Sequence, residues 1–253
     1  MINSLQNERV KRAHALMTSA KARRKADQIA IEGARLIRDA LRSGCQPDFI
    51  LYDPDAVQID SIIPDTVITA MALPASAAVI RHIAATETPQ GVIGVFPTPS
   101  PALPQPLDRV LILDAIGDPG NLGTLLRSAR AAGVQAVLLA PGCADAWSPK
   151  ALRAGMGAHF ALPALEASWT RIALLCSGLH IRLADMTGDA AYDQADWRSP
   201  WALIVGSEAH GASEQAEALA RQRVYIPMEQ DAESLNAAIA ASVILFEAAR
   251  QRR

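Results

Sequence analysis

The chain has 253 residues, which is enough for two domains of ordinary size and a substantial core. Half of the residues are hydrophobic and 20% are charged, which excludes a globally disordered chain. The formal net charge of -2 identifies no partner, but its distribution is uneven: residues 1–44 hold ten Lys and Arg against four Asp and Glu, and the remainder carries -8. A basic segment on an acidic body predicts an anionic partner at one end, with a solvated helix face as the alternative.

Cysteine usage and hydropathy indicate the compartment. Cys45, Cys143 and Cys176 are odd in number and widely spaced, which argues against disulfides and a cysteine zinc site and fits a reducing cytoplasm. The N-terminus lacks the apolar run of a signal peptide, and the longest apolar stretch, residues 237–246, is shorter than the ~18 residues that span a bilayer. The histidines show no metal-ligand spacing. We therefore expect a soluble cytoplasmic protein with neither a membrane nor a metal partner.

The N-terminal part alternates short apolar runs with helical patterns, which predicts a compact α/β domain over residues 1–96. The expected helices are 9–25, 34–44 and 74–86, and the expected strands are 28–33, 48–53, 65–70 and 91–96. Residues 97–108, "PTPSPALPQPLD", then hold five prolines in twelve positions. Proline at this density prevents regular pairing and predicts an extended linker.

Residues 109–253 form the second expected domain. Its predicted strands are continuously apolar rather than alternating, which indicates a parallel sheet covered on both faces. They lie at 109–116, 135–140, 201–206 and 224–227, with a further apolar stretch at 171–185 and a last helix from Leu235 to Arg250.

A glycine-rich segment, "GDPGNLGTLLRSARAAG" at 117–133, follows the first of these strands. A phosphate-binding P-loop needs a lysine, and the loop has none. A dinucleotide fingerprint needs G-x-G-x-x-G and an acid after the next strand, where this chain has Ala140, Pro141 and Gly142. Dinucleotide binding stays as an alternative, because the topology is similar.

The helix after this segment has two distinct faces. Leu122, Leu125, Leu126 and Ala129 form an apolar stripe, and Arg127 lies roughly opposite. Arg127 is either a solvated arginine or faces a groove at the carboxyl edge of the sheet, where such folds bind ligands.

Three ordered motifs resemble the SpoU–TrmH branch of the SPOUT RNA methyltransferases. They are "DPGNLGTLLRSARAAG", "IVGSEAHGAS" at Ile204–Ser213 and "IPMEQDAESLNAAIAASVILFE" at Ile226–Glu247. The segment Ser148–Pro163 is similar to the family's intervening region, and "IAIEGARLIRDALRSG" resembles its L30e-like substrate-binding domain.

The resemblance implies transfer of the methyl group of S-adenosylmethionine (SAM) to a ribose 2′-hydroxyl of tRNA or rRNA. It also implies a catalytic domain with a C-terminal trefoil knot and a homodimer. By similarity, the backbone around Gly206, Ile226 and Leu235 encloses the cofactor, although Ile226 and Leu235 could be plain core. The expected active-site residues are Asn121, Arg127, Glu208, Ser234 and Asn236.

The chemistry suggests roles for some of these side chains. A guanidinium is a poor base, so we expect Arg127 to clamp an RNA phosphate and polarise the hydroxyl. We expect Glu208 to position Arg127 or the target nucleotide, with a turn or cap residue as the alternative. Ser234 has an alternative role as the N-cap of the last helix. Asn236 could fill that helix's first turn.

The charge split then predicts that Lys21, Arg23, Arg24 and Lys25 contact RNA phosphates with little base specificity. The chain departs from the family pattern at four positions: Arg130, Ala209, Ala212 and Gln230. A non-catalytic RNA-binding or ribosome-assembly protein that retains the fold is the second hypothesis. A nicotinamide dehydrogenase is the third.

Overall fold

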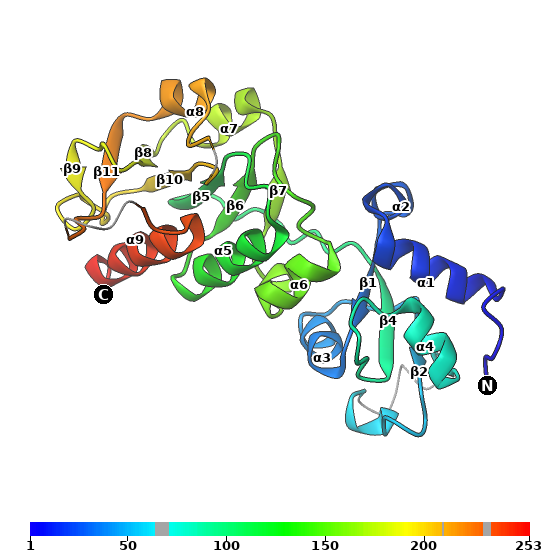
Figure 1. The fold of residues 1–253 in the computed structure, drawn as a ribbon. Coiled ribbons are helices and arrows are strands. Elements are labelled where there is room, and N and C mark those ends of the chain that lie inside the picture. The colour runs from blue at the N-terminus through cyan, green and yellow to red at the C-terminus, as the bar shows by residue number, and fades with distance from the viewer. Residues whose placement is uncertain (64–70, 209, 230–233) are drawn as a thin grey trace. The chain divides into compact units, whose positions relative to one another are not determined.

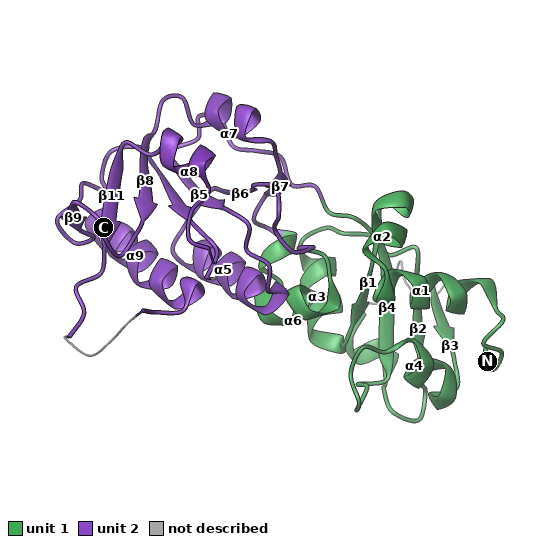
Figure 2. Ribbon diagram, turned by 45° about the horizontal axis from the view of Figure 1, so that its top comes forward, with its two compact units in different colours: residues 1–99, 147–160 green, residues 100–146, 161–253 purple. Residues whose placement is uncertain are grey.

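The computed structural model describes residues 1–63, 71–208, 210–229 and 234–253. The strand predicted at 65–70, and the departures at Ala209 and Gln230, lie outside these residues. The chain divides into two compact units, shown in Figure 2. The first unit holds residues 1–99 and 147–160, and the second unit holds 100–146 and 161–253.

The first unit is a four-stranded sheet with helices on both faces (Figure 1). Its strands are β1 (Gln28–Glu32), β2 (Phe49–Tyr52), β3 (Ala72–Pro74) and β4 (Val92–Pro97). Its helices are α1 (Glu8–Thr18), α2 (Ala20–Ala26), α3 (Ala34–Arg42), α4 (Ala77–Ile83) and α6 (Pro149–Gly155), with short 3-10 turns at Ile59–Ser61 and Ala158–Phe160.

The strand order is β1-β4-β2-β3, with β4 antiparallel to both neighbours and β2 parallel to β3. Alternate strand residues face opposite sides, so the sheet supports two cores. Ala30 and Val95 pack with α1 and α4, whereas Ile29 and Ile31 pack with α3 and α6.

The single helix predicted at 9–25 is wrong, because two helices replace it. Ser19 lies between them in an extended conformation (φ -131°, ψ 115°). Its Oγ accepts a hydrogen bond from the Ala22 amide at 3.2 Å, which caps the start of α2. A serine side chain that satisfies a free amide favours a helix start, so it breaks a periodicity that would otherwise run on.

The second unit is built on a seven-stranded sheet in the order β7-β6-β5-β10-β8-β11-β9. The strands are β5 (Arg109–Leu113), β6 (Ala136–Leu139), β7 (Ala164–Glu166), β8 (His180–Ala184), β9 (Ala190–Ala191), β10 (Trp201–Val205) and β11 (Gln222–Tyr225). The helices are α5 (Pro119–Ala131), α7 (Trp169–Leu175), α8 (Glu214–Leu219) and α9 (Ala237–Gln251).

Every pair of neighbouring strands in this sheet is parallel, which confirms the predicted α/β class. Ile172 of α7 and Ala216 of α8 pack on one face of the sheet. Figure 1 shows α5 and α9 side by side on the other, where the Ser242 hydroxyl lies 2.7 Å from that of Ser128. The central strands are therefore buried on both faces, which is why they read as unbroken apolar runs. The trefoil knot stays a prediction.

Residues 147–160 interrupt the second unit in sequence but pack with the first. Leu152 and Phe160 belong to the same core as Ile31 and Ile37. The sequence places this segment in the second domain because it lies between two strands of that domain. The division at the proline-rich segment itself stays a prediction.

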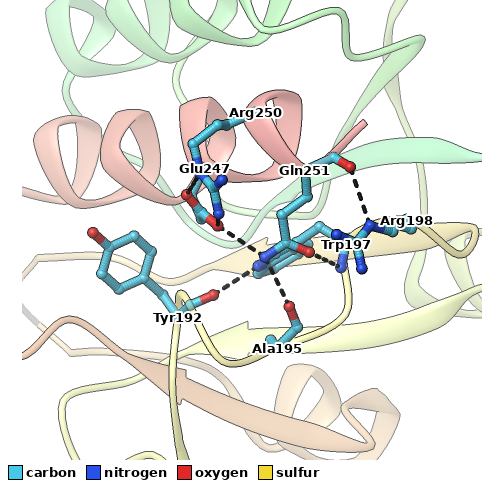
Figure 3. A network of polar contacts seen from close by, with 7 residues as sticks. All are labelled: Tyr192, Ala195, Trp197, Arg198, Glu247, Arg250 and Gln251. Carbon is cyan, nitrogen blue, oxygen red and sulfur yellow. Dashed lines mark hydrogen bonds and ion pairs between the residues drawn. The ribbon is translucent and has the colours of Figure 1, made fainter. Parts of the chain in front are cut away.

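A polar network anchors the C-terminal helix α9 to the loop before β10 (Figure 3). The Gln251 side chain accepts from the Trp197 amide at 3.0 Å and donates to the Ala195 carbonyl at 3.1 Å. It also donates to Glu247, whose carboxylate receives both Nε and Nη2 of Arg250 at 2.7 and 2.8 Å. These contacts hold the end of α9 to that loop. Within the described ranges, no helix is long and apolar enough to cross a membrane.

Candidate functional site

Helix α5 begins immediately at the glycine-rich segment, because "DPG" is a helix start. Asp118 is the N-cap, and its Oδ1 accepts from the Asn121 amide at 2.8 Å, while Pro119 occupies the first helical position. Gly120 therefore belongs to the first helical turn rather than to a loop. This start projects Asn121 at the carboxyl edge of the parallel sheet, where ligands of such folds bind.

The loop after β10 folds back on itself. The backbones of Ser207 and Gly211 exchange two hydrogen bonds, both of 2.9 Å. A Cβ on Gly206 would lie 2.5 Å from the Gly211 carbonyl oxygen, so only glycine fits there. The crowding at Gly206 therefore comes from the loop's own backbone. Glu208 lies within this turn.

Asp114 connects this loop to the end of β5. Its side chain is 2% exposed, and Oδ2 accepts from the Ser213 amide at 2.6 Å. Ser213 is in turn the N-cap of α8. One buried carboxylate thus joins the end of β5 to the end of the Glu208 loop. The next residue, Ala115, has a positive φ of 53°, an uncommon conformation for a residue with a side chain.

The start of α9 supplies the third segment. Asn236 is the N-cap, and its Oδ1 accepts from the amides of Ala238 and Ile239 at 3.0 and 3.2 Å. The N-cap role that the sequence offers to Ser234 therefore belongs to Asn236. Because the Asn236 oxygen accepts these capping hydrogen bonds, its NH2 group points away from the helix.

These three segments meet at the carboxylate of Glu208. Its Oε1 accepts from Nδ2 of Asn236 at 2.8 Å and from Nδ2 of Asn121. Nδ2 of Asn236 also lies 3.3 Å from Oδ1 of Asn121. Three side chains separated by up to 115 positions therefore form one hydrogen-bonded cluster. Its amides fix the carboxylate in one orientation.

A cavity of about 470 Å³ opens beside this cluster. Gly206, Ile226 and Leu235, the three residues expected to hold the cofactor, all line it. Glu208, Ser234, Asn236, His210 and Ala212 line it as well. This volume is in the range of small-ligand sites.

The remaining walls have the chemistry that SAM requires. Met228 and Ile244 supply apolar surface. The acids Asp185 and Glu217 also line the cavity, and Arg223 pairs with them at 3.1 and 3.4 Å. The three groups together leave one negative charge, which favours a cationic ligand. Burial raises the pKa of Asp185, but hydrogen bonds from Thr187 and Arg223 outweigh it and leave this pKa lowered. Asp185 is therefore ionised at neutral pH. The residues present fit SAM.

The sequence analysis missed Asp114, Asp185 and Glu217. Asp114 and Asp185 each follow the last residue of a buried strand, so an acid at the end of an apolar run was the available signal. Glu217 lies on α8 and gave no such signal.

Arg127 stands apart from the cluster. It is exposed on α5, and within the part of the chain that the structure describes it makes no hydrogen bond or ion pair. Six residues separate it from Asn121, which corresponds to about 9 Å along the helix axis and about 240° around it. The structure brings Asn121, Glu208 and Asn236 together and leaves Arg127 and Ser234 without a bond to them.

The four basic residues of α2 differ in environment. Lys21, Arg24 and Lys25 are exposed, but Arg23 is 7% exposed. The Arg23 guanidinium donates to the carbonyl of Leu16 at 2.5 Å and so satisfies the end of α1. No group of three His, Cys, Asp or Glu side chains among the described residues could hold a metal ion.

The parallel sheet, the cavity and the carboxylate held by two amides agree with the methyltransferase of the SPOUT class that the sequence resembles. Residues 108–246 match the SpoU rRNA Methylase family, and residues 7–94 match the MRM3-like substrate binding domain. The chain belongs to the SpoU rRNA methylase family, which confirms the resemblance found in the sequence.

Several relatives and solved structures are similar over nearly the whole chain. The 23S rRNA (guanosine(2553)-2′-O)-methyltransferase RlmP of Bacillus subtilis is 34% identical, covering 97% of this chain and 97% of the relative. Mouse mitochondrial rRNA methyltransferase 3 is 34% identical, covering 96% of this chain and 73% of the relative. The crystal structure of the SpoU methyltransferase AviRb from Streptomyces viridochromogenes in complex with AdoMet has a TM-score of 0.88 at 28% identity, covering 98% of each chain.

Proposed function

We propose that this chain transfers the methyl group of SAM to a ribose 2′-hydroxyl of ribosomal RNA. The observation that carries the proposal is the Glu208 carboxylate, held by Asn121 and Asn236 at the wall of the cavity. A relative named as a 2′-O-methyltransferase of 23S rRNA and a similar structure solved with AdoMet support it.

Gly206, Ile226 and Leu235 would hold the cofactor through backbone and apolar contacts. The one negative charge that remains after Arg223 pairs with Asp185 and Glu217 would counter its positive charge. When bound, SAM supplies a methyl group on an electrophilic sulfonium. The folded loop of Ser207–Gly211 keeps Glu208 beside that position.

Glu208 and Arg127 would act on the RNA. The fixed Glu208 carboxylate accepts a hydrogen bond from the target nucleotide and so orients the ribose. Arg127, with its guanidinium uncommitted among the described residues, clamps a phosphate and polarises the hydroxyl through a bidentate contact. Water or the phosphate accepts the proton. Ser234 lines the cavity and contributes a further polar contact.

The enzyme would work as a homodimer through α9. Ile239, Val243 and Phe246 are 54%, 36% and 47% exposed and lie at i, i+4 and i+7 on one face of this helix. An apolar stripe of this kind marks a protein interface. Because Arg127 of the same chain faces away from the cluster, we infer that Arg127 of the partner subunit completes it.

RNA contacts of the first unit would include Lys21, Arg24 and Lys25, which are exposed on one short helix. Arg23, buried against α1, would support this helix rather than touch RNA. The reduced cysteines fit a cytoplasmic location beside the ribosomal substrate.

Transfer of labelled methyl from SAM to an unmodified 23S rRNA transcript tests the function. We expect incorporation into ribose 2′-O-methyl groups. The absence of transfer, together with intact RNA binding, would instead support the non-catalytic RNA-binding protein.

A further inference from the structure

Helices α3 and α6 come from distant parts of the chain but cover the same face of the four-stranded sheet (Figure 2). Ile37 of α3 and Leu152 of α6 share one core cluster with strand residues of that sheet. A Cβ on Gly157, just after α6, would lie 2.9 Å from Oδ2 of Asp39 on α3. The two helices are therefore neighbours in one layer on the sheet. Each of them has one side that faces away from the sheet.

Both outward faces are basic. On α3, Arg35, Arg38 and Arg42 follow a spacing of three and four, which places them within about 60° of one another and opposite the buried side. On α6, Lys150 and Arg153 occupy the equivalent positions, opposite Ala151 and Leu152. All five side chains are exposed. We call these five residues the α3–α6 basic face.

Acids are rare within these two segments of the sequence. Asp39 is the only acid within 34–42, where it lies 4.0 Å from Arg35, and residues 147–160 contain no Asp or Glu. The first unit as a whole carries 13 Lys and Arg against 10 Asp and Glu, a net +3, while the second carries 11 against 16, a net -5. The insertion of residues 147–160 thus adds charge to the unit that is already basic.

The chemistry of this face selects the class of partner. Protein interfaces are anchored by buried aromatic and apolar side chains. Among the described residues, none of the exposed large hydrophobic side chains lies on α3 or α6. A line of arginines and lysines without apolar anchors is instead suited to a phosphate backbone, which guanidinium groups bind bidentately.

We propose that the α3–α6 basic face binds the phosphate backbone of the substrate RNA, at a site separate from the α2 cations. This inference rests on the proposed function for the identity of the RNA. Backbone contacts position a nucleic acid without reading its sequence, so this face would orient the RNA rather than select the nucleotide. Because α6 is supplied by the chain between β6 and β7, the face forms only when that segment folds onto the first unit.

The test is RNA binding by the full-length variant Arg38→Gln/Arg42→Gln/Arg153→Gln, which leaves the Arg35–Asp39 pair intact. The probe is an unmodified 23S rRNA transcript, titrated over a salt series in a filter-binding assay. We expect binding at least about 10-fold weaker and a salt slope less negative by about 2 to 3, because each phosphate contact contributes about 0.7 to 0.9 to the slope. SAM affinity should stay unchanged.

The matched control removes three exposed cations from the opposite face of the same sheet, as Arg9→Gln/Lys11→Gln/Arg81→Gln. We expect its affinity within about twofold of the unmodified protein and its salt slope unchanged. Wild-type binding by the first variant, or an equal loss in both, would overturn the proposal. If the triple variant has a lowered melting temperature, the single variant Arg38→Gln replaces it. This variant keeps Arg42 and Arg153 in the last turns of their helices, and its salt slope should still be less negative by about 1.

The same preparations separate this inference from the proposed function. If the unmodified protein transfers no methyl group while the face variant still loses RNA affinity, only the proposed activity fails. If methyl transfer occurs and the variant binds RNA normally, only the assignment of this face fails.

Discussion

Glu208 is the residue on which the three segments of the site converge. Two amides donate to the same oxygen, Oε1, which fixes the carboxylate and leaves Oε2 to face a ligand. The cluster holds its geometry before any ligand binds. Preorganised polar groups of this kind save the cost of reorientation during the reaction.

Glu208→Gln tests this role. The glutamine oxygen can still accept from both asparagine amides, but an uncharged NH2 donor replaces Oε2 and cannot accept a hydrogen bond from the target nucleotide. We expect kcat to fall by about 100-fold, with the Kd for SAM within about threefold of wild type. Calorimetry with SAM and single-turnover methylation measure the two quantities. Glu214→Gln, an exposed change on α8, is the matched control and should retain full activity.

Asp114 provides a second prediction at this scale. Asp114→Ala leaves the Ser213 amide without its acceptor and should cost about 1–3 kcal/mol of unfolding free energy. The Glu208 loop would loosen with it, so SAM affinity should fall as well. Urea unfolding and SAM titration check both effects. Asp60→Ala, on an exposed turn, should change neither, and an Asp114→Ala protein with normal stability and SAM affinity would contradict the role.

Among the elements, helix α9 contributes to the structure in three ways. Its N-cap Asn236 belongs to the site, its buried face packs on the sheet, and its end is fixed by the Gln251 network (Figure 3). Hydrogen bonding from Arg250 lowers the pKa of Glu247 to about 2. The stability that this carboxylate contributes is present above its ordinary pKa of 4.5 and is lost as the pH falls toward 2.

Glu247→Gln should therefore be pH-selective in its effect. Its melting temperature should lie below that of wild type above about pH 5, and the difference should shrink below about pH 4.5 and close near pH 2, where the carboxylate of the folded wild type is also protonated. Thermal unfolding monitored by circular dichroism between these limits measures the gap. A gap that stays constant with pH would show that the ion pair does not contribute.

The sequence could predict most of these elements, because their signals are local. β5 and β10 were found since strands buried on both faces are continuously apolar. The break at Ser19 was missed because apolar periodicity continues across it. β3 was missed because three residues are too few to show a pattern.

The features that the sequence could not predict depend on packing between distant parts of the chain. The affiliation of residues 147–160 with the first unit depends on contacts that no local pattern contains. Likewise, Arg23 is indistinguishable from its basic neighbours in sequence, and only the fold shows that it caps α1. The site residues came from motif resemblance, and the bonds among Asn121, Glu208 and Asn236 came from the structure.

For the whole molecule, the exposed stripe of α9 predicts a homodimer. Ile239→Ser/Phe246→Ser should shift the protein to monomer in sedimentation equilibrium, because it removes apolar area from the proposed interface. Methyl transfer should fall with it if Arg127 of the partner subunit completes the site. Leu174→Ser, an equally exposed apolar position on α7, should leave both properties intact. A dimer that persists in the double variant would place the interface elsewhere.

The most direct test of the account is the chemical position of the transferred methyl group. Purified protein, SAM with a labelled methyl group and an unmodified 23S rRNA transcript are incubated, and the RNA is digested to nucleosides for mass spectrometry. The account predicts label in a 2′-O-methylribose and its loss in Glu208→Gln. Label on a base, or no label while a dinucleotide binds tightly in place of SAM, would contradict it.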